Sequence, residues 1–161
     1  MDGMRQKAIQ DYYPDHLNQC YGCGGLNTHG LRIKSYWLGD RAVCTFIPQP
    51  YHMGPPGYVY GGLLASLIDC HGNATAVAAA CQEAGREPDS EPLWRYLTAT
   101  LHVEYLRPTP IEGPLELEGR VKEVKGRKVA VEVTVTVAGK ICVKGKVISV
   151  LAPERFLKPA S

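Results

Sequence analysis

The stretch GGLLASLIDCHGNATAVAAACQEA, residues 61–84, decides the fold that we expect for this chain. Apolar residues occupy nearly every side of a helix drawn over it. A narrow polar seam, which spans roughly 60° at ~100° per residue, contains Gly62, Ser66, Asp69 and Asn73. Because a helix that is hydrophobic all round is normally buried, we expect this helix to lie at the centre of the domain. Gly85, which can adopt a left-handed conformation, is placed to end it.

The residues after this helix alternate between apolar and polar, a pattern typical of β-strands. Candidate strands separated by turn residues cover 94–106, 114–124, 127–138 and 140–151. Their short connections predict that all of them form one antiparallel meander. Within the first of these strands, simple alternation places Glu104 on one face together with Thr98, Thr100 and His102.

Two further candidate strands, residues 31–37 and 42–47, precede a loop of residues 48–58 that is rich in Pro and Gly. One buried helix and about six strands predict an α+β domain, in which a curved antiparallel sheet wraps around a central helix. We expect residues 1–19 to be an N-terminal arm or short helix, residues 20–151 to be the domain, and residues 152–161 to be a C-terminal tail.

The composition is that of a folded protein, with 161 residues, 45% apolar and 21% charged residues. A formal net charge of +2 argues against a nucleic-acid binder, which would have a basic stripe or a strongly basic total. No apolar run approaches the ~20 residues that cross a bilayer, and the first residues lack the apolar stretch of a secretory signal. We therefore expect a soluble, cytoplasmic protein without a membrane partner.

The six cysteines do not suggest a disulfide scaffold, because such scaffolds occur in short secreted chains. Four of them, Cys44, Cys70, Cys81 and Cys142, stand singly in apolar patterns, where cysteine behaves as a small hydrophobe. Only Cys20 and Cys23 form a close pair, and together with His16 and His29 they are a conceivable set of four zinc ligands. Structural zinc requires four well-placed ligands, so we predict no metal, no cofactor and six reduced thiols.

The most informative residue is Asp69, which lies in the middle of the apolar helix. Desolvation raises the pKa of a buried carboxyl toward the range useful for a general base. The alternative is that Asp69 only accepts hydrogen bonds from a turn or a neighbouring chain. At the start of the helix, Gly61 and Gly62 would let a ligand approach unpaired N–H groups, which can stabilise an oxyanion. The simpler alternative for the glycine pair is a loop-to-helix turn.

The run GYVYGGLLASLID, residues 57–69, resembles the signature of hotdog-fold thioesterases of the PaaI type, in which His-Gly-Gly opens the central helix and an acidic residue follows. The lead-in CYGCG at residues 20–24, the segment VEYLRPTP at 103–110 and the residues around 126–129 are also similar to that family. The resemblance covers roughly residues 20–151 and implies the hotdog fold. It also implies a homodimer or homotetramer with active sites at the subunit interface.

The resemblance implies an acyl-CoA thioesterase, in which Asp69 activates water or attacks the thioester itself and the Gly62 N–H binds the oxyanion. Thr98 takes the position of the family's water-placing Ser or Thr. The sequence departs from the family at Tyr60, which replaces the expected His and can donate a hydrogen bond but cannot easily shuttle protons. His52, eight residues earlier, is either a substitute for that His or a surface-loop histidine. His71 points away from the seam, as a core or interface residue.

Substrate contacts are expected along the seam and at basic positions, namely Tyr60, Gly61, Ser66, Asn73, Arg107, Arg127 and Lys128. The three basic residues are candidates for the phosphates of coenzyme A, or are simply solvated strand ends. Because Tyr60 replaces the His, a non-catalytic acyl-CoA-binding protein is the main alternative function. Another hotdog activity, such as enoyl-CoA hydration, is a second alternative. The residues leave open the acyl chain, whether coenzyme A or acyl carrier protein is the carrier, and the choice between nucleophile and base for Asp69.

Overall fold

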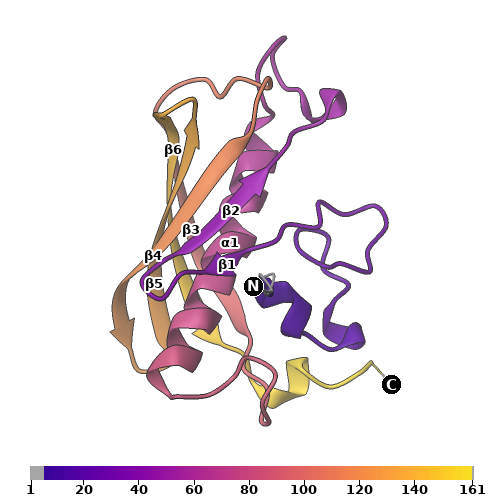
Figure 1. The fold of residues 1–161 in the computed structure, drawn as a ribbon, viewed down its shortest axis with the longest axis vertical. Coiled ribbons are helices and arrows are strands. Elements are labelled where there is room, and N and C mark those ends of the chain that lie inside the picture. Colours follow the sequence, from indigo (N-terminus) through magenta and orange to yellow (C-terminus); the bar gives the residue numbers. More distant parts are fainter. Residues whose placement is uncertain (1–5, 161) are drawn as a thin grey trace, which may run out of the picture.

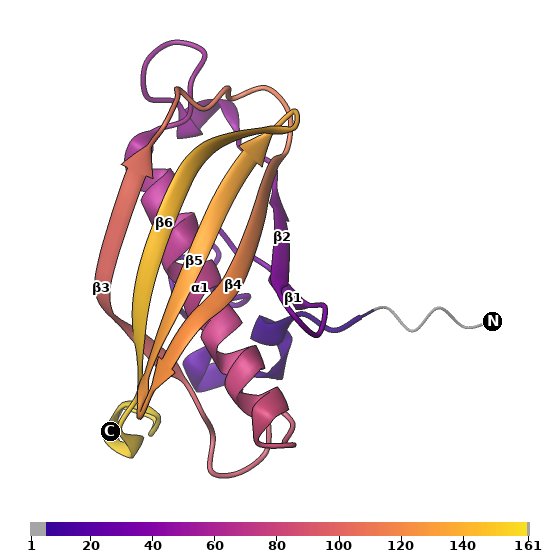
Figure 2. The same ribbon diagram turned by 90° about the vertical axis from the view of Figure 1, so that its left-hand side faces the viewer.

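The computed structural model describes residues 6–160 and contains one long helix against one six-stranded antiparallel sheet. Helix α1 runs from Gly61 to Glu83 along the inner face of the curved sheet (Figure 2). The strands are β1 (Tyr36–Trp37), β2 (Ala42–Phe46), β3 (Tyr96–Tyr105), β4 (Leu115–Lys125), β5 (Lys128–Val137) and β6 (Lys140–Leu151). The α+β class and the central helix predicted from the sequence are confirmed.

The order of strands in the sheet is β1-β2-β4-β5-β6-β3. Strands β4, β5 and β6 form the expected meander, and its turns use the positive φ angles of Gly126 (60°), Ala138 (48°) and Gly139 (78°). The prediction that 94–106 continues this meander is wrong, because β3 pairs with β6 and not with β4. The segment after β3 crosses an end of the sheet instead of making a tight turn, and this leaves β3 as an edge strand (Figure 2).

The expected strand at residues 31–37 is also wrong in its extent, since only Tyr36 and Trp37 pair with β2. The backbone N–H groups of Leu31 and Ile33 donate instead to the carbonyls of Tyr21 (2.8 Å) and Gly22 (3.1 Å). These bonds attach the segment to the turn of residues 20–24. The alternating pattern therefore reflects packing beside that turn and not membership of the sheet.

The helix lies close to the sheet because glycines remove side chains at the contact. A Cβ on Gly145 of β6 would lie 2.3 Å from Cγ2 of Ile68, and one on Gly72 of α1 would lie 2.6 Å from Cγ2 of Val147. Real Cβ atoms do not approach so closely, so larger residues at these two positions would push the helix away from β6. The helix ends at Glu83, and Gly85 (φ 63°) follows its cap as expected; the Arg86 N–H donates there to the Cys81 carbonyl over 3.0 Å.

Residues 6–35 cover the side of α1 that the sheet leaves open (Figure 1). Among them, Ile9 and Gln10 are buried, and Gln10 hydrogen-bonds Ser35 through the Ser35 N–H (2.8 Å) and hydroxyl (3.1 Å). The Ser35 hydroxyl in turn lies 2.8 Å from Nδ1 of the fully buried His71, whose Nε2 is 3.2 Å from the Ala42 carbonyl. His71 is therefore a core residue whose two ring nitrogens both have partners.

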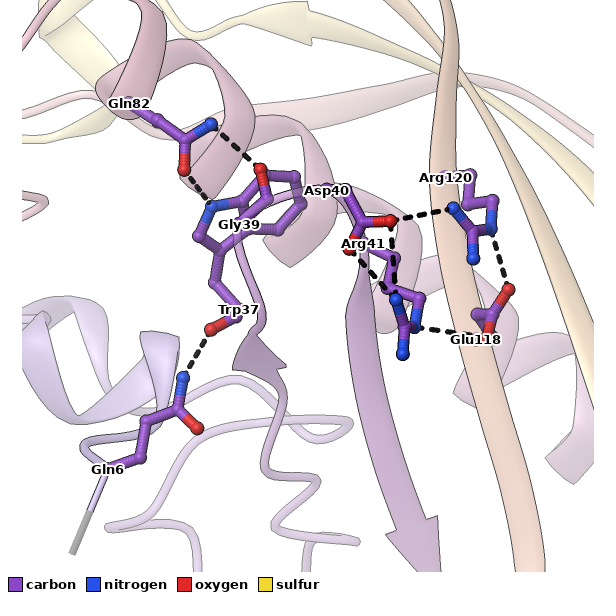
Figure 3. Close-up of polar contacts among 8 residues, drawn as sticks. All are labelled: Gln6, Trp37, Gly39, Asp40, Arg41, Gln82, Glu118 and Arg120. Carbon is purple, nitrogen blue, oxygen red and sulfur yellow. Dashed lines mark hydrogen bonds and ion pairs between the residues drawn. The ribbon is translucent and has the colours of Figure 1, made fainter.

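The turn between β1 and β2 is held to α1 and to β4 by polar contacts (Figure 3). Gln82 near the end of α1 accepts from the Trp37 indole (2.6 Å) and donates to the Gly39 carbonyl (2.8 Å). Asp40 pairs with Arg41 (2.9 Å) and Arg120 (3.2 Å). Ion pairs at a surface contribute little to stability, so these contacts mainly fix the position of the turn.

Among residues 6–160, no helix has the length and apolar character needed to cross a membrane.

Candidate active site

Asp69 is the end of a line of hydrogen bonds that joins α1 to two strands. The Thr98 hydroxyl of β3 donates to Oδ1 of Asp69. The Asn73 amide donates to Oγ1 of Thr98 over 2.8 Å, and the Ser149 hydroxyl of β6 donates to Oδ1 of Asn73 over 2.7 Å. Every donor in this line points toward the carboxylate, and hydrogen bonds that share one direction polarise one another. The line therefore orients Asp69 as an acceptor, and among residues 6–160 no hydrogen bond reaches its second oxygen, Oδ2.

Thr98 reaches Asp69 because β3 contains a bulge at Ala99. Thr98 pairs with Ser149, whereas Thr100 pairs with Ile148, so β3 advances two residues while β6 advances one. This irregularity reverses the alternation of side chains along the strand. The expectation that Thr98 shares a face with Thr100, His102 and Glu104 is therefore wrong. Thr98 lies on the side of α1, and the other three residues lie on the outer face.

Ser149 is the residue of this line that the sequence analysis missed. Its side chain is fully buried among the apolar residues of β6. The sequence did contain one signal for it, because Ser149 continues the alternating, inward-facing series Val143, Gly145 and Val147 and is its only hydroxyl. Only the pairing of β3 with β6 shows that this hydroxyl faces Thr98 across the sheet.

The start of α1 leaves N–H groups free beside Tyr60. Within residues 6–160, no hydrogen bond is formed by the N–H groups of Gly61 or Gly62, as is usual for the first turn of a helix. The Tyr60 ring lies over Gly62, where an added Cβ would be 2.5 Å from Cε1 and 2.8 Å from the hydroxyl oxygen of Tyr60. The Tyr105 hydroxyl donates to the Gly61 carbonyl over 2.8 Å and anchors this turn to the end of β3. The Ser66 hydroxyl is used within the helix, since it donates to the Gly62 carbonyl over 2.9 Å.

His52 shares a cleft with this helix start. The cleft has a volume of about 810 Å³, and Tyr60, Gly62, Ser66 and His52 are among the residues that line it. Nδ1 of His52 accepts from the Gln49 N–H over 2.9 Å, so the neutral ring carries its proton on Nε2. Partial burial lowers the pKa of His52, which favours that neutral form. His52 thus lines the same cleft as Tyr60, although it belongs to the loop that precedes α1.

Asp69 lines a different cavity of about 300 Å³, together with Asn73, Thr98, Cys20 and Arg95. Gly62 and Asp69 share one face of α1, but they are seven positions apart, which is roughly 10 Å along the axis. In a single chain the N–H donors and the carboxylate therefore belong to two separate cavities.

Cys20, which lines the Asp69 cavity, has a perturbed thiol. Hydrogen bonds from the thiols of Cys23 and Cys70 hold the pKa of Cys20 well below its usual value.

The basic candidates lie at opposite ends of the sheet. Arg107 follows the end of β3, whereas Arg127 and Lys128 form the turn into β5, beside the start of β3. A strand of this length separates the two ends by roughly 30 Å. Arg127 also donates to the Leu151 carbonyl over 2.9 Å. The structure brings Arg127 and Lys128 together but does not bring Arg107 to them.

An antiparallel sheet wrapped around one helix, with a carboxylate in the middle of that helix and free N–H groups at its start, defines a hotdog-fold protein. The sequence model of the protein family named Thioesterase superfamily matches residues 56–143, more than half of the chain. The chain therefore belongs to that superfamily. A thioesterase superfamily protein from Shewanella loihica is 44% identical with a TM-score of 0.63, over 78% of this chain and 96% of that one.

Two further comparisons give one solved structure with the same fold and one curated relative that matches part of the chain. The PaaI protein of Escherichia coli has a TM-score of 0.62 at 14% identity, over 76% of this chain and 81% of that chain, and shows the fold alone. The acyl-coenzyme A thioesterase THEM4 of Xenopus laevis is 36% identical over 89 residues, which are 55% of this chain and 34% of that protein. The chain thus spans about a third of the length of the curated relatives that it matches.

Proposed function

We propose that this protein is an acyl-CoA thioesterase that hydrolyses its substrate with the Asp69 carboxylate. The observation that carries the proposal is the directed line Ser149–Asn73–Thr98–Asp69, which fixes a carboxylate on the polar seam of the central helix. Superfamily membership and relatives named acyl-coenzyme A thioesterase support the same activity.

The chemistry assigns each group one task. Asp69 takes a proton from a water molecule that attacks the thioester carbonyl, or it attacks that carbonyl directly and forms an anhydride that water then hydrolyses. In both cases the C–S bond breaks, the thiolate of coenzyme A leaves, and the carbonyl oxygen carries negative charge in the transition state. The Gly62 N–H, at the positive end of α1, stabilises that charge.

The complete site is proposed to form between two copies of the chain. In one copy Gly62 and Asp69 line separate cavities, so one carbonyl does not reach both groups within a common pocket. Within residues 6–160, strand β3 pairs with β6 on one side only, and it exposes Leu97 (41%) and Leu101 (38%). An exposed edge with apolar side chains is suited to pairing with a second copy, and two-fold pairing would bring the Gly62 of one chain toward the Asp69 of the other. A homodimer, or a tetramer of two such dimers, follows from this arrangement.

The test is a panel of acyl-CoA thioesters of different chain length and aromatic character, assayed with a thiol-detecting dye. Release of coenzyme A from at least one member is the expected result. Thermal stabilisation by acyl-CoA without any release of thiol would instead identify a non-catalytic binder. Loss of the enoyl absorbance without free thiol would identify a hydratase, and either outcome would overturn the proposed hydrolase.

Tyr60 is expected to hold the thioester carbonyl through its hydroxyl, because that hydroxyl lies beside Gly62, whose N–H is the proposed oxyanion donor. Tyr60→Phe should lower kcat/KM about 10-fold, the value of roughly one hydrogen bond in the transition state. Tyr60→His, which restores the family's residue, should preserve or raise it. Steady-state kinetics of the three proteins measure the effect, and equal activity of wild type and Tyr60→Phe would remove the hydroxyl from the mechanism.

A further inference from the structure

Three cysteine sulfurs meet beside the Asp69 cavity. Cys20 and Cys23 belong to the turn of residues 20–24, and Cys70 follows Asp69 on α1. Their Sγ atoms all lie within 4.8 Å of one another, and those of Cys20 and Cys70 are 3.9 Å apart. All three residues are free thiols; Cys23 and Cys70 are buried, and Cys20 is partly exposed.

The turn of residues 20–24 is built to bring Cys70 close. A Cβ on Gly22 would lie 2.3 Å from Sγ of Cys70, so only glycine leaves room for that sulfur. A Cβ on Gly24 would lie 2.4 Å from the backbone nitrogen of Cys20, which makes this turn tight. The Gly24 N–H donates to the Cys20 carbonyl over 2.8 Å and closes it. The backbone bonds from Leu31 and Ile33 anchor the turn, so the positions of the sulfurs are set by the fold.

We propose that Cys20, Cys23 and Cys70 form a binding site for one Zn²⁺ ion per chain, with the fourth coordination position facing the cavity that Asp69 lines. Thiolate is a preferred ligand of Zn²⁺, and tetrahedral bonds of ~2.3 Å require sulfurs roughly 3.8 Å apart. The separation of Cys20 and Cys70 matches this value. Three protein ligands and one open position are the arrangement of zinc sites that admit a further ligand.

The charge of the surroundings favours a divalent ion. Arg95 lines the same cavity, where its guanidinium stacks on the Tyr13 ring (3.8 Å from the centroid) and donates to the Leu17 carbonyl (2.9 Å). Three thiolates with Zn²⁺ carry a charge of −1, and the Asp69 carboxylate of the same cavity adds another negative charge, which Arg95 offsets in part. A monovalent copper ion would leave −2 in a partly buried place, and uncompensated charge in such a place is costly.

This site differs from the zinc ligand set weighed from the sequence. His16 lies outside the cluster, with Nε2 2.8 Å from the Leu157 carbonyl, and His29 lines the other cleft. Cys70, which the apolar pattern of the helix assigned to the core, takes the third position. The basis for expecting no metal was the lack of further ligands near Cys20 and Cys23, and the tertiary structure supplies one.

The experiment uses the full chain, reduced with a phosphine and freed of metal, and titrates it with Co²⁺ and then Zn²⁺. We expect one Co²⁺ per chain with thiolate-to-metal charge-transfer absorption, displaced by one equivalent of Zn²⁺. Cys70→Ser and Cys20→Ser should lower the affinity for Zn²⁺ at least about 100-fold, because each removes a direct ligand. Gly22→Ala, which keeps all three thiols but crowds Sγ of Cys70, should weaken binding about 10-fold or more. Cys142→Ser, a buried cysteine on β6 away from the cluster, is the matched control and should bind as wild type.

A second measurement guards against variants that do not fold. In the wild-type chain, Zn²⁺ should protect Cys20, Cys23 and Cys70 from alkylation, with the modified residues identified by mass spectrometry. The proposal is overturned if wild type shows no charge-transfer band, if Cys70→Ser binds as tightly as wild type, or if Zn²⁺ protects none of the three thiols. Formation of a disulfide within the trio without any metal uptake would overturn it as well.

Discussion

Asp69→Asn is expected to lower the turnover of acyl-CoA by about 10³-fold or more, whichever of the two mechanisms operates. General-base and nucleophilic catalysis by a carboxylate contribute roughly 10² to 10⁴ in rate, and an amide supplies neither. The amide keeps the volume and can still accept from Thr98, so the fold should persist. The measurement is kcat with the best substrate of the panel, together with thermal unfolding of the variant.

Glu104→Gln provides the matched control for this substitution. It is the same carboxylate-to-amide change on β3, but Glu104 lies on the outer face beside His102 (3.2 Å) and should leave turnover within about twofold of wild type. If Asp69→Asn retained wild-type turnover while remaining folded, the carboxylate mechanism would be wrong.

The line of donors behind Asp69 predicts a graded series. Thr98→Val removes the hydroxyl that touches the carboxylate and should lower kcat by about 10- to 100-fold, as expected for one charge-assisted hydrogen bond. Ser149→Ala removes the far end of the line and should have a smaller effect, because Asn73 still donates to Thr98. A larger loss for Ser149→Ala than for Thr98→Val would show that the line does not act through Asp69.

Acid is expected to destabilise the fold through His71. Burial lowers the pKa of this residue to about 4, although the Ala42 carbonyl partly opposes the shift. The folded state therefore keeps the ring neutral between pH 6.5 and 4, whereas the unfolded state binds a proton there. The unfolded state gains free energy as the pH falls through this window, so stability is lost. From pH 7 to pH 5 the loss from this one group is about 2 kcal/mol.

The free energy of unfolding in urea, measured at pH 7 and pH 5 for wild type and His71→Gln, tests this expectation. The glutamine variant should be less stable at pH 7, because its side chain does not reproduce the bonds to Ser35 and Ala42. Between pH 7 and pH 5, however, the free energy of unfolding of the variant should fall by ~2 kcal/mol less than that of wild type. An identical pH dependence in both proteins would mean that His71 does not titrate as its burial implies.

Much of the architecture could be predicted because its signals are local. The apolar run of residues 61–84 yields helix α1, and the valines of residues 129–137 yield a strand with one buried face. Turn residues predicted the hairpins at Gly126 and Gly139, where positive φ angles occur. The placement of Asp69 and Gly62 on one face follows from helical periodicity alone. Patterns of period 2 and 3.6 describe which face of an element is buried, and that was sufficient for the fold class.

The partners of each residue depended on contacts between segments that are distant in the chain. The pairing of β3 with β6 and the bulge at Ala99 decide that Thr98 faces Asp69, and no alternation pattern contains either fact. The meeting of Cys70 with Cys20 and Cys23 depends on how residues 6–35 pack against α1. Local sequence sets the conformation of the backbone and the polarity of each face. Buried polar and sulfur-containing side chains find their partners through the packing of distant segments, because the native packing leaves few such groups without a hydrogen bond. Those partners are therefore defined only in the folded chain.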